Sequence, residues 1–298
     1  VVVITLSLPQ TLPTFKLFQQ SALKGDTSEQ LFLRTRLEPR HLLTFFAPDY
    51  YGNRITQNYW AEKFTQVDYT NANIFIGSLG FFFLIVCLLK PKISHTENFF
   101  LASAVIPITM AVKSPFTFFL AQLHIPMLTT GVAAGILFLT VFSLAVLSAY
   151  GFDYWQKHPN LTNKQYLMIV AIYFLLVLTL FFVPNQFRIV TFRNVAVPFT
   201  LGFITILTVA IHHFITSYNH PFLSSLLKLN PKPVTIVALL FLFLASAETT
   251  LYAHKLLSFS PQKYSFPQHQ LIEELQQRAG LYRTIGFWEN SLANNFHT

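Results

Sequence analysis

The sequence predicts an all-α polytopic membrane protein in which about seven hydrophobic helices cross the bilayer, the first of them truncated. Hydrophobic residues make up 53% of the chain and charged residues only 11%, whereas soluble domains average about 25% charged residues. The apolar residues are also concentrated in blocks, and a helix needs roughly 20 apolar residues to cross a bilayer core about 30 Å thick. The 33 Phe, 12 Tyr and 3 Trp suit lipid-facing surfaces and interfacial aromatic belts.

Six complete hydrophobic blocks each predict one span. They cover residues 72–89, 99–112, 127–150, 166–183, 195–218 and 234–252. Residues 1–12 predict the outer end of another span, and we expect Val1 to be an internal position of a longer protein. Residues 114–125 are too few to span and too apolar for a free loop, so they predict an interfacial or re-entrant helix.

Four segments organise the chain. They are the end of a truncated transmembrane helix (1–18), an extracytoplasmic loop (19–71), a transmembrane domain of six spans (72–252) and the start of an extracytoplasmic α/β domain (253–298). In the last segment, Pro267 suits the first turn of a helix and Gly280 the position after its end. Residues 281–287 then alternate as in a strand, and a lone strand needs partners beyond this segment.

The loop charges set the predicted orientation. One set of alternate loops carries Lys90, Lys92, Lys157, Lys164, Lys228 and Lys232, and the other carries Lys113, Arg188 and Arg193. Because the more positive loops of a membrane protein usually face the cytoplasm, we expect the first set inside. Both large polar segments, 19–71 and 253–298, are then extracytoplasmic.

Several functional classes find no support in the composition. The net charge is +8, but the Lys and Arg residues are scattered among hydrophobic blocks, so no nucleic-acid-binding stripe is predicted. The single Cys87 lies in an apolar block and forms no disulfide framework. The His residues define no metal-ligand set, and the sequence identifies no cofactor.

The loop 19–71 contains the best candidate site. Asp49, beside Tyr50 and Tyr51, is the candidate catalytic residue, because a carboxylate at a membrane surface can act as general base toward a sugar hydroxyl. The candidate substrate-binding residues of this loop are Arg34, Arg36, Arg40, Tyr50 and Tyr51, since Arg binds phosphate bidentately. The alternative is that this stretch makes turns and that the Arg side chains are solvated or touch lipid phosphates.

Two further candidates lie near the outer ends of spans. Lys113 and Glu248 are expected at similar depth, and ionisable groups in a span are costly and usually paired or functional. We predict a structural ion pair, with a shared polar cavity that binds substrate as the alternative. Gly131 and Gly135 form a GxxxG motif that predicts close packing between helices of this chain.

Short motifs in chain order resemble the bacterial YfhO family of membrane proteins. They are Leu-Thr-Phe-Phe-Ala-Pro at 43–48 with Tyr51-Gly52, Ile-Phe-Ile-Gly at 74–77, Leu-Ala-Val-Leu-Ser-Ala-Tyr-Gly-Phe-Asp at 144–153, and Tyr-Arg-Thr-Ile-Gly at 282–286.

The resemblance implies a GT-C-like glycosyltransferase in the bacterial cytoplasmic membrane. Such an enzyme, surrounded by membrane lipid, takes a sugar from a polyprenyl-phosphate donor and places it on a cell-envelope polymer outside the membrane. The acidic catalytic residue usual in the first extracytoplasmic loop of these enzymes would lie upstream of Val1. The similarity also includes His-Ile-Pro-Met at 124–127, but residues 128–135 lack the Arg that family members tend to carry after this Ile-Pro stretch.

Two other functions stay open. A transporter or lipid flippase would show ionisable residues near the midplane and broken helices in matching positions. A non-catalytic envelope-assembly protein would use the loop 19–71 as a docking surface. The spans are nearly free of midplane charge, which favours chemistry at the outer surface.

Overall fold

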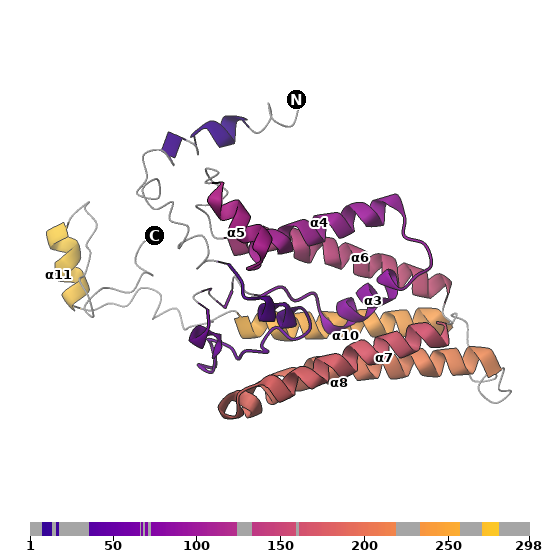
Figure 1. Ribbon diagram of the computed structural model, residues 1–298. Helices are drawn as coiled ribbons and strands as arrows, with labels where there is room; N and C mark the ends of the chain where they lie inside the picture. Colours follow the sequence, from indigo (N-terminus) through magenta and orange to yellow (C-terminus); the bar gives the residue numbers. More distant parts are fainter. Residues whose placement is uncertain are drawn as a thin grey trace. The chain divides into compact units, whose positions relative to one another are not determined.

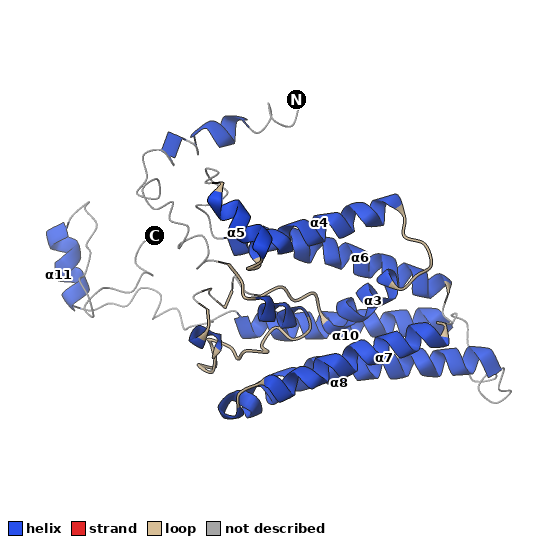
Figure 2. Ribbon diagram, viewed as in Figure 1, coloured by secondary structure: helices blue, strands red, loops and turns tan. Residues whose placement is uncertain are grey.

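A computed structural model of the 298-residue chain describes a mostly helical protein. The described residues are 8–13, 16–17, 36–65, 67, 69–70, 73–123, 133–158, 161–218, 233–256 and 270–279. Within these ranges there is no β-strand, and the ribbon in Figure 2 consists of helices joined by loops. The chain divides into two units, Val1–Ala253 and His254–Thr298.

Six long helices build the first unit, and successive ones run in opposite directions (Figure 1). They are α3 (Ser78–Leu88), α4 (His95–Ala111), α6 (Leu137–Lys157), α7 (Asn163–Leu178), α8 (Asn185–Tyr218) and α10 (Pro233–Leu256). The shorter elements are α5 (Pro115–Gln122) and the 3-10 helices η2 (Pro39–Phe45), η3 (Ala61–Lys63), η4 (Ala133–Ile136) and η5 (Thr179–Phe182). Residues 36–77 lie at the end where α3 begins and α4 finishes, which we call the loop end.

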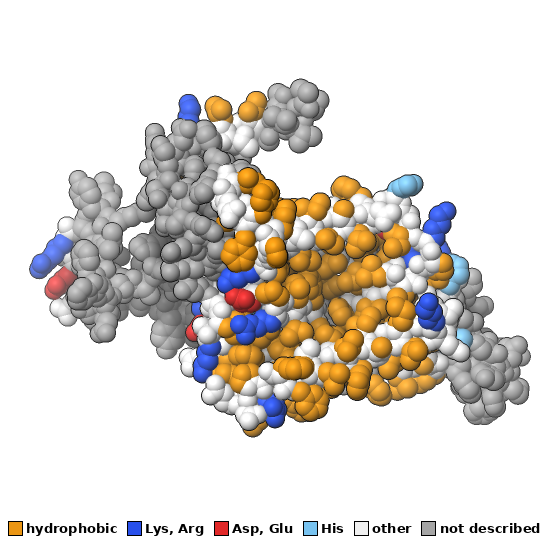
Figure 3. Space-filling model, in the orientation of Figure 1, with side chains coloured by type: hydrophobic (Ala, Val, Ile, Leu, Met, Phe, Trp, Pro, Cys, Tyr) orange, Lys and Arg blue, Asp and Glu red, His pale blue; other side chains and the backbone are white. Residues whose placement is uncertain are grey.

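The membrane character of the helices is confirmed. Four of them are long and apolar enough to cross a bilayer by length and composition: Leu137–Lys157, Asn163–Phe182, Asn185–Ile211 and Val237–His254. Hydrophobic side chains cover the helical face seen in Figure 3, whereas charged side chains lie toward its two ends. This is the pattern expected when lipid surrounds the middle of a helical protein.

Seven full-length spans are not supported by the described helices. The first predicted block, 72–89, is helical only from Ser78, so α3 has 11 residues. Gly77 has a φ of +87°, outside the helical region, and residues 73–77 are irregular. The α4 helix has 17 residues, also below the roughly 20 that a full span needs. Of the predicted stub at 1–12, the described part, residues 8–12, is helical.

Side-chain caps explain where several helices begin. The side chains of Ser94, Ser114 and Thr162 each accept a hydrogen bond from the backbone N–H three residues further on. The side chain of that third residue in turn accepts a hydrogen bond from the backbone N–H of the cap residue. Such capping boxes satisfy N–H groups that have no partner inside the helix. The second of them starts α5, which lies within the segment 114–125 that predicted a short helix.

A close helix contact joins α3 and α6 at Gly151. A Cβ atom at this position would lie 1.9 Å from the backbone oxygen of Phe83, so only glycine permits this approach. The ring of Trp155, fully buried one turn further along α6, packs on the same Phe83 side chain at 5.9 Å between centroids. The predicted close packing of the GxxxG motif is wrong at Gly135, where an added Cβ would have open space. Gly131 lies outside the described residues.

The second unit contains α11 (Gln270–Ala279), which ends immediately before Gly280, as the sequence predicts. The strand predicted at 281–287 lies outside the described residues. The structure therefore shows a helix at this position and gives no support for an α/β domain.

We expect Gly151→Ala to lower the free energy of unfolding by about 1–3 kcal/mol, because the added methyl group forces α3 and α6 apart. Gly135→Ala is the matched control and should change it by less than about 0.5 kcal/mol. Denaturant unfolding in detergent measures both values. Equal effects of the two substitutions would contradict the close approach at Gly151.

Candidate functional site

The loop between residues 36 and 77 packs against the helices of the first unit through its aromatic side chains. The Phe46 ring contacts the rings of Tyr173 and Phe199 at centroid distances of 5.7 and 4.8 Å. Trp60 stacks on Phe187 at 4.9 Å with an interplanar angle of 2°. These aromatic contacts bury the irregular backbone of the loop against α7 and α8.

Asp49 lies at the centre of a buried polar network in this loop. Asp49 is only 5% exposed. Oδ1 of Asp49 accepts hydrogen bonds from the hydroxyl of Tyr69 at 2.5 Å and from Nδ2 of Asn53 at 3.0 Å. Burial raises the pKa of Tyr69, and the neighbouring Asp49 charge raises it further, so the phenol stays protonated and continues to donate.

A tight turn holds this network in place. Gly52 has a φ of +84°, and a Cβ there would lie 2.0 Å from the backbone oxygen of Asn58. Asn53, fully buried, accepts a hydrogen bond from the backbone N–H of Ile55 at 2.7 Å. The turn that the sequence predicts at this point is confirmed, and it directs the Asn53 amide toward Asp49.

The network continues from the loop to α10. The hydroxyl of Tyr252 lies 3.4 Å from that of Tyr69 and also accepts a hydrogen bond from Nδ2 of Asn73. Sequence reasoning missed Asn53, Tyr69, Asn73 and Tyr252. Tyr252 ends a predicted span and is 183 residues from Tyr69 in the chain, so no local pattern indicates that the two meet.

Of the two tyrosines beside Asp49, one connects the loop to η5 and the other makes a contact within the loop. Tyr50 donates to Oγ1 of Thr179 at 3.0 Å, and Tyr51 donates to the backbone oxygen of Arg40 at 2.6 Å. Burial raises the pKa of both tyrosines, so both hydroxyls remain donors at neutral pH. Tyr50 thus forms a hydrogen bond with η5, and Tyr51 forms one with η2.

The predicted arginines occupy different environments. The guanidinium of Arg40 lies 3.5 Å above the centre of the Phe64 ring, a cation–π contact. Arg36 is only 2% exposed, and burial lowers its pKa to about 10. Arg34 lies outside the described residues.

A short backbone bridge brings Arg36 close to the end of α4. The N–H of Leu37 donates to the backbone oxygen of Ala111, and the N–H of Lys113 donates to the backbone oxygen of Leu37, both at 2.8 Å. The same bridge places Glu38 beside Lys113, whose Nζ lies 2.5 Å from the Glu38 carboxylate.

The predicted Lys113–Glu248 pair is therefore wrong. Glu248 lies in α10 and accepts hydrogen bonds from the backbone N–H of Ser78, at 2.8 Å, and from its hydroxyl. Ser78 is the first residue of α3, and the first N–H groups of a helix have no partner within it. The Glu248 carboxylate supplies that partner, while Lys113 pairs with the nearer Glu38.

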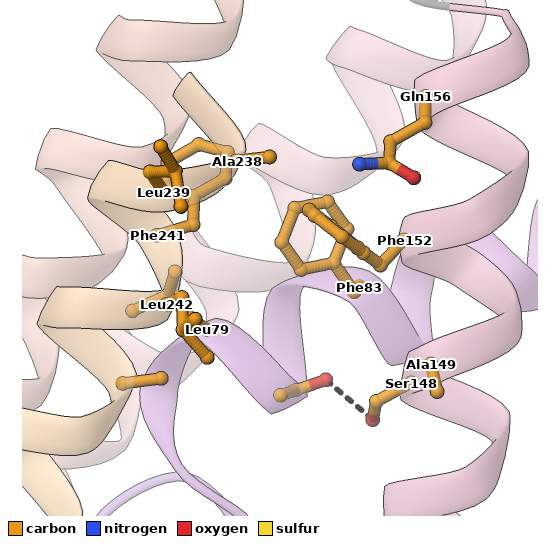
Figure 4. A pocket seen from close by; sticks show the side chains of 12 residues that line it. Leu79, Phe83, Ser148, Ala149, Phe152, Gln156, Ala238, Leu239, Phe241 and Leu242 are labelled. Carbon is orange, nitrogen blue, oxygen red and sulfur yellow. Dashed lines mark hydrogen bonds between the residues drawn. The ribbon is translucent and has the colours of Figure 1, made fainter. Parts of the chain in front are cut away.

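An apolar groove of about 530 Å³ lies between α3, α6 and α10 (Figure 4). The rings of Phe83 and Phe152 pack edge to face at 5.0 Å between centroids. Ser148, one of its two polar side chains, donates to the backbone oxygen of Gly80 at 2.7 Å. The full lining is Leu79, Gly80, Phe83, Ser148, Ala149, Phe152, Gln156, Ala238, Leu239, Phe241, Leu242 and Ala245. The volume suits a bound apolar molecule.

A second cavity, of about 480 Å³, lies at the loop end, and we call it the loop-end cavity. It is lined by Thr70, Asn73, Gly135, Leu137, Phe138, Val141 and Phe142. Asn73 both lines this cavity and donates to Tyr252, so the Asp49 network reaches the cavity wall.

Comparisons with family models, curated proteins and solved structures find no match to this chain. Within the ranges that the structure describes, no group of three or more His, Cys, Asp or Glu side chains has the arrangement of a metal site.

We expect Glu248→Ala to lower the free energy of unfolding by about 1–3 kcal/mol, because it leaves the buried N–H of Ser78 without an acceptor. Glu248→Gln keeps an acceptor oxygen and should retain most of the stability. Denaturant unfolding in detergent measures the difference. If both variants unfold like the unmodified protein, Glu248 does not cap α3.

His41 gives the loop a pH dependence. It is fully buried among Tyr51 and Phe64, and Nδ1 lies 3.1 Å from the backbone oxygen of Glu38. Burial lowers the pKa of His41 below its ordinary value of 6.5, with Arg40 and Lys113 adding to that effect and Glu38 opposing it.

As the pH drops below about 6.5, His41 takes up a proton more readily in the unfolded chain than in the folded one. The free energy of unfolding therefore falls over this range. We expect His41→Gln to reduce this fall, as measured by melting temperature in detergent at pH 8 and pH 5.5. Identical pH slopes for the two proteins would contradict the neutral, buried state of His41.

Proposed function

We propose that this chain is the membrane module of a glycosyltransferase that uses a polyprenyl-phosphate-linked sugar to modify a cell-envelope polymer. The reaction takes place on the outer face of the bacterial cytoplasmic membrane, as the resemblance to the YfhO family implies. One observation carries the proposal: a single stripe of α10 connects the apolar groove to the Asp49 network.

The stripe follows helical spacing. Ala238, Phe241 and Ala245 line the groove, and Glu248 and Tyr252 continue the same face at steps of three and four residues. The stripe is thus apolar along the groove and polar at the loop end. A ligand with a long apolar tail and a polar head matches this order, and a polyprenyl-phosphate sugar has that shape.

The cations near the end of α4 are suited to the donor phosphate. Leu37 and Val112 pack in one hydrophobic cluster with Leu137, which lines the loop-end cavity. Arg36 and Lys113 are the neighbours of Leu37 and Val112 in sequence. We assign these two cations, with Arg34 and Arg40 of the same loop, to the phosphate leaving group, whose developing charge they stabilise.

The transfer itself needs one base. The oxygen of an acceptor hydroxyl attacks the anomeric carbon, and the bond from that carbon to the phosphate oxygen breaks with its electron pair staying on the phosphate. The hydroxyl proton passes to the Asp49 carboxylate, which Tyr69 and Asn53 hold in position. The products are the glycosylated polymer and polyprenyl phosphate.

We also propose that the chain crosses the membrane seven times. The 11 residues of α3 rise about 16 Å, and the irregular residues 73–77 can add at most about 18 Å, which together match a core about 30 Å thick. With α4 and the segment 1–12, the chain crosses seven times. Residues 19–71 and 253–298 are then extracytoplasmic, and the latter begin an α/β domain.

A lipid flippase or transporter is the second candidate, because α3 starts inside the helical unit. Helices that begin at membrane depth, with their N-termini directed at an anionic group, are typical of transporters. Here the anionic group is the chain's own Glu248.

Transfer from a radiolabelled polyprenyl-phosphate sugar to envelope polymer, in membranes that contain the full-length protein, tests the proposal. We expect Asp49→Asn to reduce transfer by at least about 100-fold, since general base catalysis contributes 10²–10⁴. We expect Arg40→Ala to reduce transfer less, because its charge is one of several.

Asp153→Asn is the matched control, because this exposed carboxylate pairs with Lys157 at the opposite end of α6, and it should leave transfer unchanged. Full transfer by a folded Asp49→Asn variant contradicts the site. The absence of transfer from any polyprenyl donor contradicts the enzyme, and lipid movement across the membrane in that case supports the flippase.

A further inference from the structure

One face of α6 lines both the apolar groove and the loop-end cavity. Phe138 and Phe142 lie in the loop-end cavity, while Ala149, Phe152 and Gln156 lie in the groove. These positions follow one another at helical spacing, with exposed Ala145 between the two sets. From Leu137 to Gln156 the helix rises about 28 Å, close to the thickness of a bilayer core. The two spaces therefore lie along one helix face that extends through the membrane.

The two spaces differ in chemistry. The groove is apolar over nearly all of its surface, whereas the polar residues Thr70 and Asn73 are among those that line the loop-end cavity. Beside these polar groups, Phe138 and Phe142 are 67% and 60% exposed. None of the described side chains that line the cavity carries a charge.

Uncharged hydrogen-bonding groups beside open aromatic rings match a sugar. Sugar hydroxyls both donate and accept hydrogen bonds, as the side chains of Asn and Thr do. The C–H face of a sugar ring is apolar and can pack on a Phe ring. A phosphate would instead require cationic partners, which this lining does not include among its described residues.

We propose that the loop-end cavity binds the sugar of the lipid-linked donor, while the donor's tail occupies the apolar groove. This inference rests on the proposed function and deepens it. Asn73 carries two amide hydrogens, of which one is directed at Tyr252. Tyr252 adjoins Tyr69, which donates to Asp49, so a sugar that binds Asn73 is connected by hydrogen bonds to the proposed base.

Binding by the full-length protein in lipid nanodiscs tests the inference, with native mass spectrometry as the readout. Three probes share one tail: a polyprenyl-phosphate hexose, the polyprenyl phosphate without sugar, and the polyprenol. We expect the unmodified protein to bind the hexose lipid about tenfold more tightly than the phosphate without sugar, as one or two well-placed hydrogen bonds allow. Asn73→Leu should abolish this preference and leave binding of the other two lipids unchanged.

Two variants complete the design. Phe138→Ala replaces an exposed ring without removing a hydrogen bond, so it should reduce the sugar preference even if Asn73→Leu fails to fold. Ala149→Phe narrows the groove and should weaken the binding of all three lipids to the same extent.

Three outcomes overturn the inference. They are a sugar preference that persists in both cavity variants, equal binding of the hexose lipid and the phosphate without sugar by the unmodified protein, and no binding of any probe. The first two leave the proposed function standing, and the third contradicts it as well.

Discussion

The hydrogen bonds from Ser78 to Glu248 allow α3 to begin inside the helical unit. An N–H group without an acceptor costs several kcal/mol in hydrocarbon, so a helix normally starts at the membrane surface where water or a cap is present. Glu248 provides the cap from α10, a separate helix. Because α3 needs no water at its start, loop residues such as Phe46, Tyr51 and Trp60 can pack in one core cluster with Phe82 and Phe83 of α3.

The loop in that position gives the protein its polar interior. Aromatic contacts of Phe46 and Trp60 fix the loop against α7 and α8, and the turn at Gly52 presents Asp49 to Tyr69. The apolar groove and the loop-end cavity then lie along α6, the one apolar and the other partly polar. The carboxylate network therefore lies at the loop end, and α10 contributes residues both to this network and to the apolar groove.

The sequence predicts the helices well and their contacts poorly. Hydrophobic blocks give the long helices, and capping residues such as Ser114 mark a short one, because both are local patterns. The turn near Asp49 is also local, since Gly52 and Asn53 have strong turn preferences.

Other features depend on residues far apart in the chain. Glu248 binds Ser78 and Lys113 binds Glu38, whereas charge and depth alone suggested that Glu248 and Lys113 pair with each other. The close helix contact falls at Gly151, outside the GxxxG motif, because helix packing depends on which helices are neighbours. No periodicity shows that Tyr252 reaches the loop, so the site beyond Asp49 and its neighbours was not predictable.

Hydrogen–deuterium exchange of the full-length protein in lipid nanodiscs tests most directly whether the loop is packed inside the helical unit. Buried, hydrogen-bonded backbone amides exchange slowly, whereas those of a solvated loop exchange within seconds. We predict slow exchange at the amides of Leu37, Gly52 and Trp60, whose N–H groups donate to backbone oxygens within the packed region. Exchange of all three within seconds would contradict the packed loop, and with it the connection between the groove and Asp49.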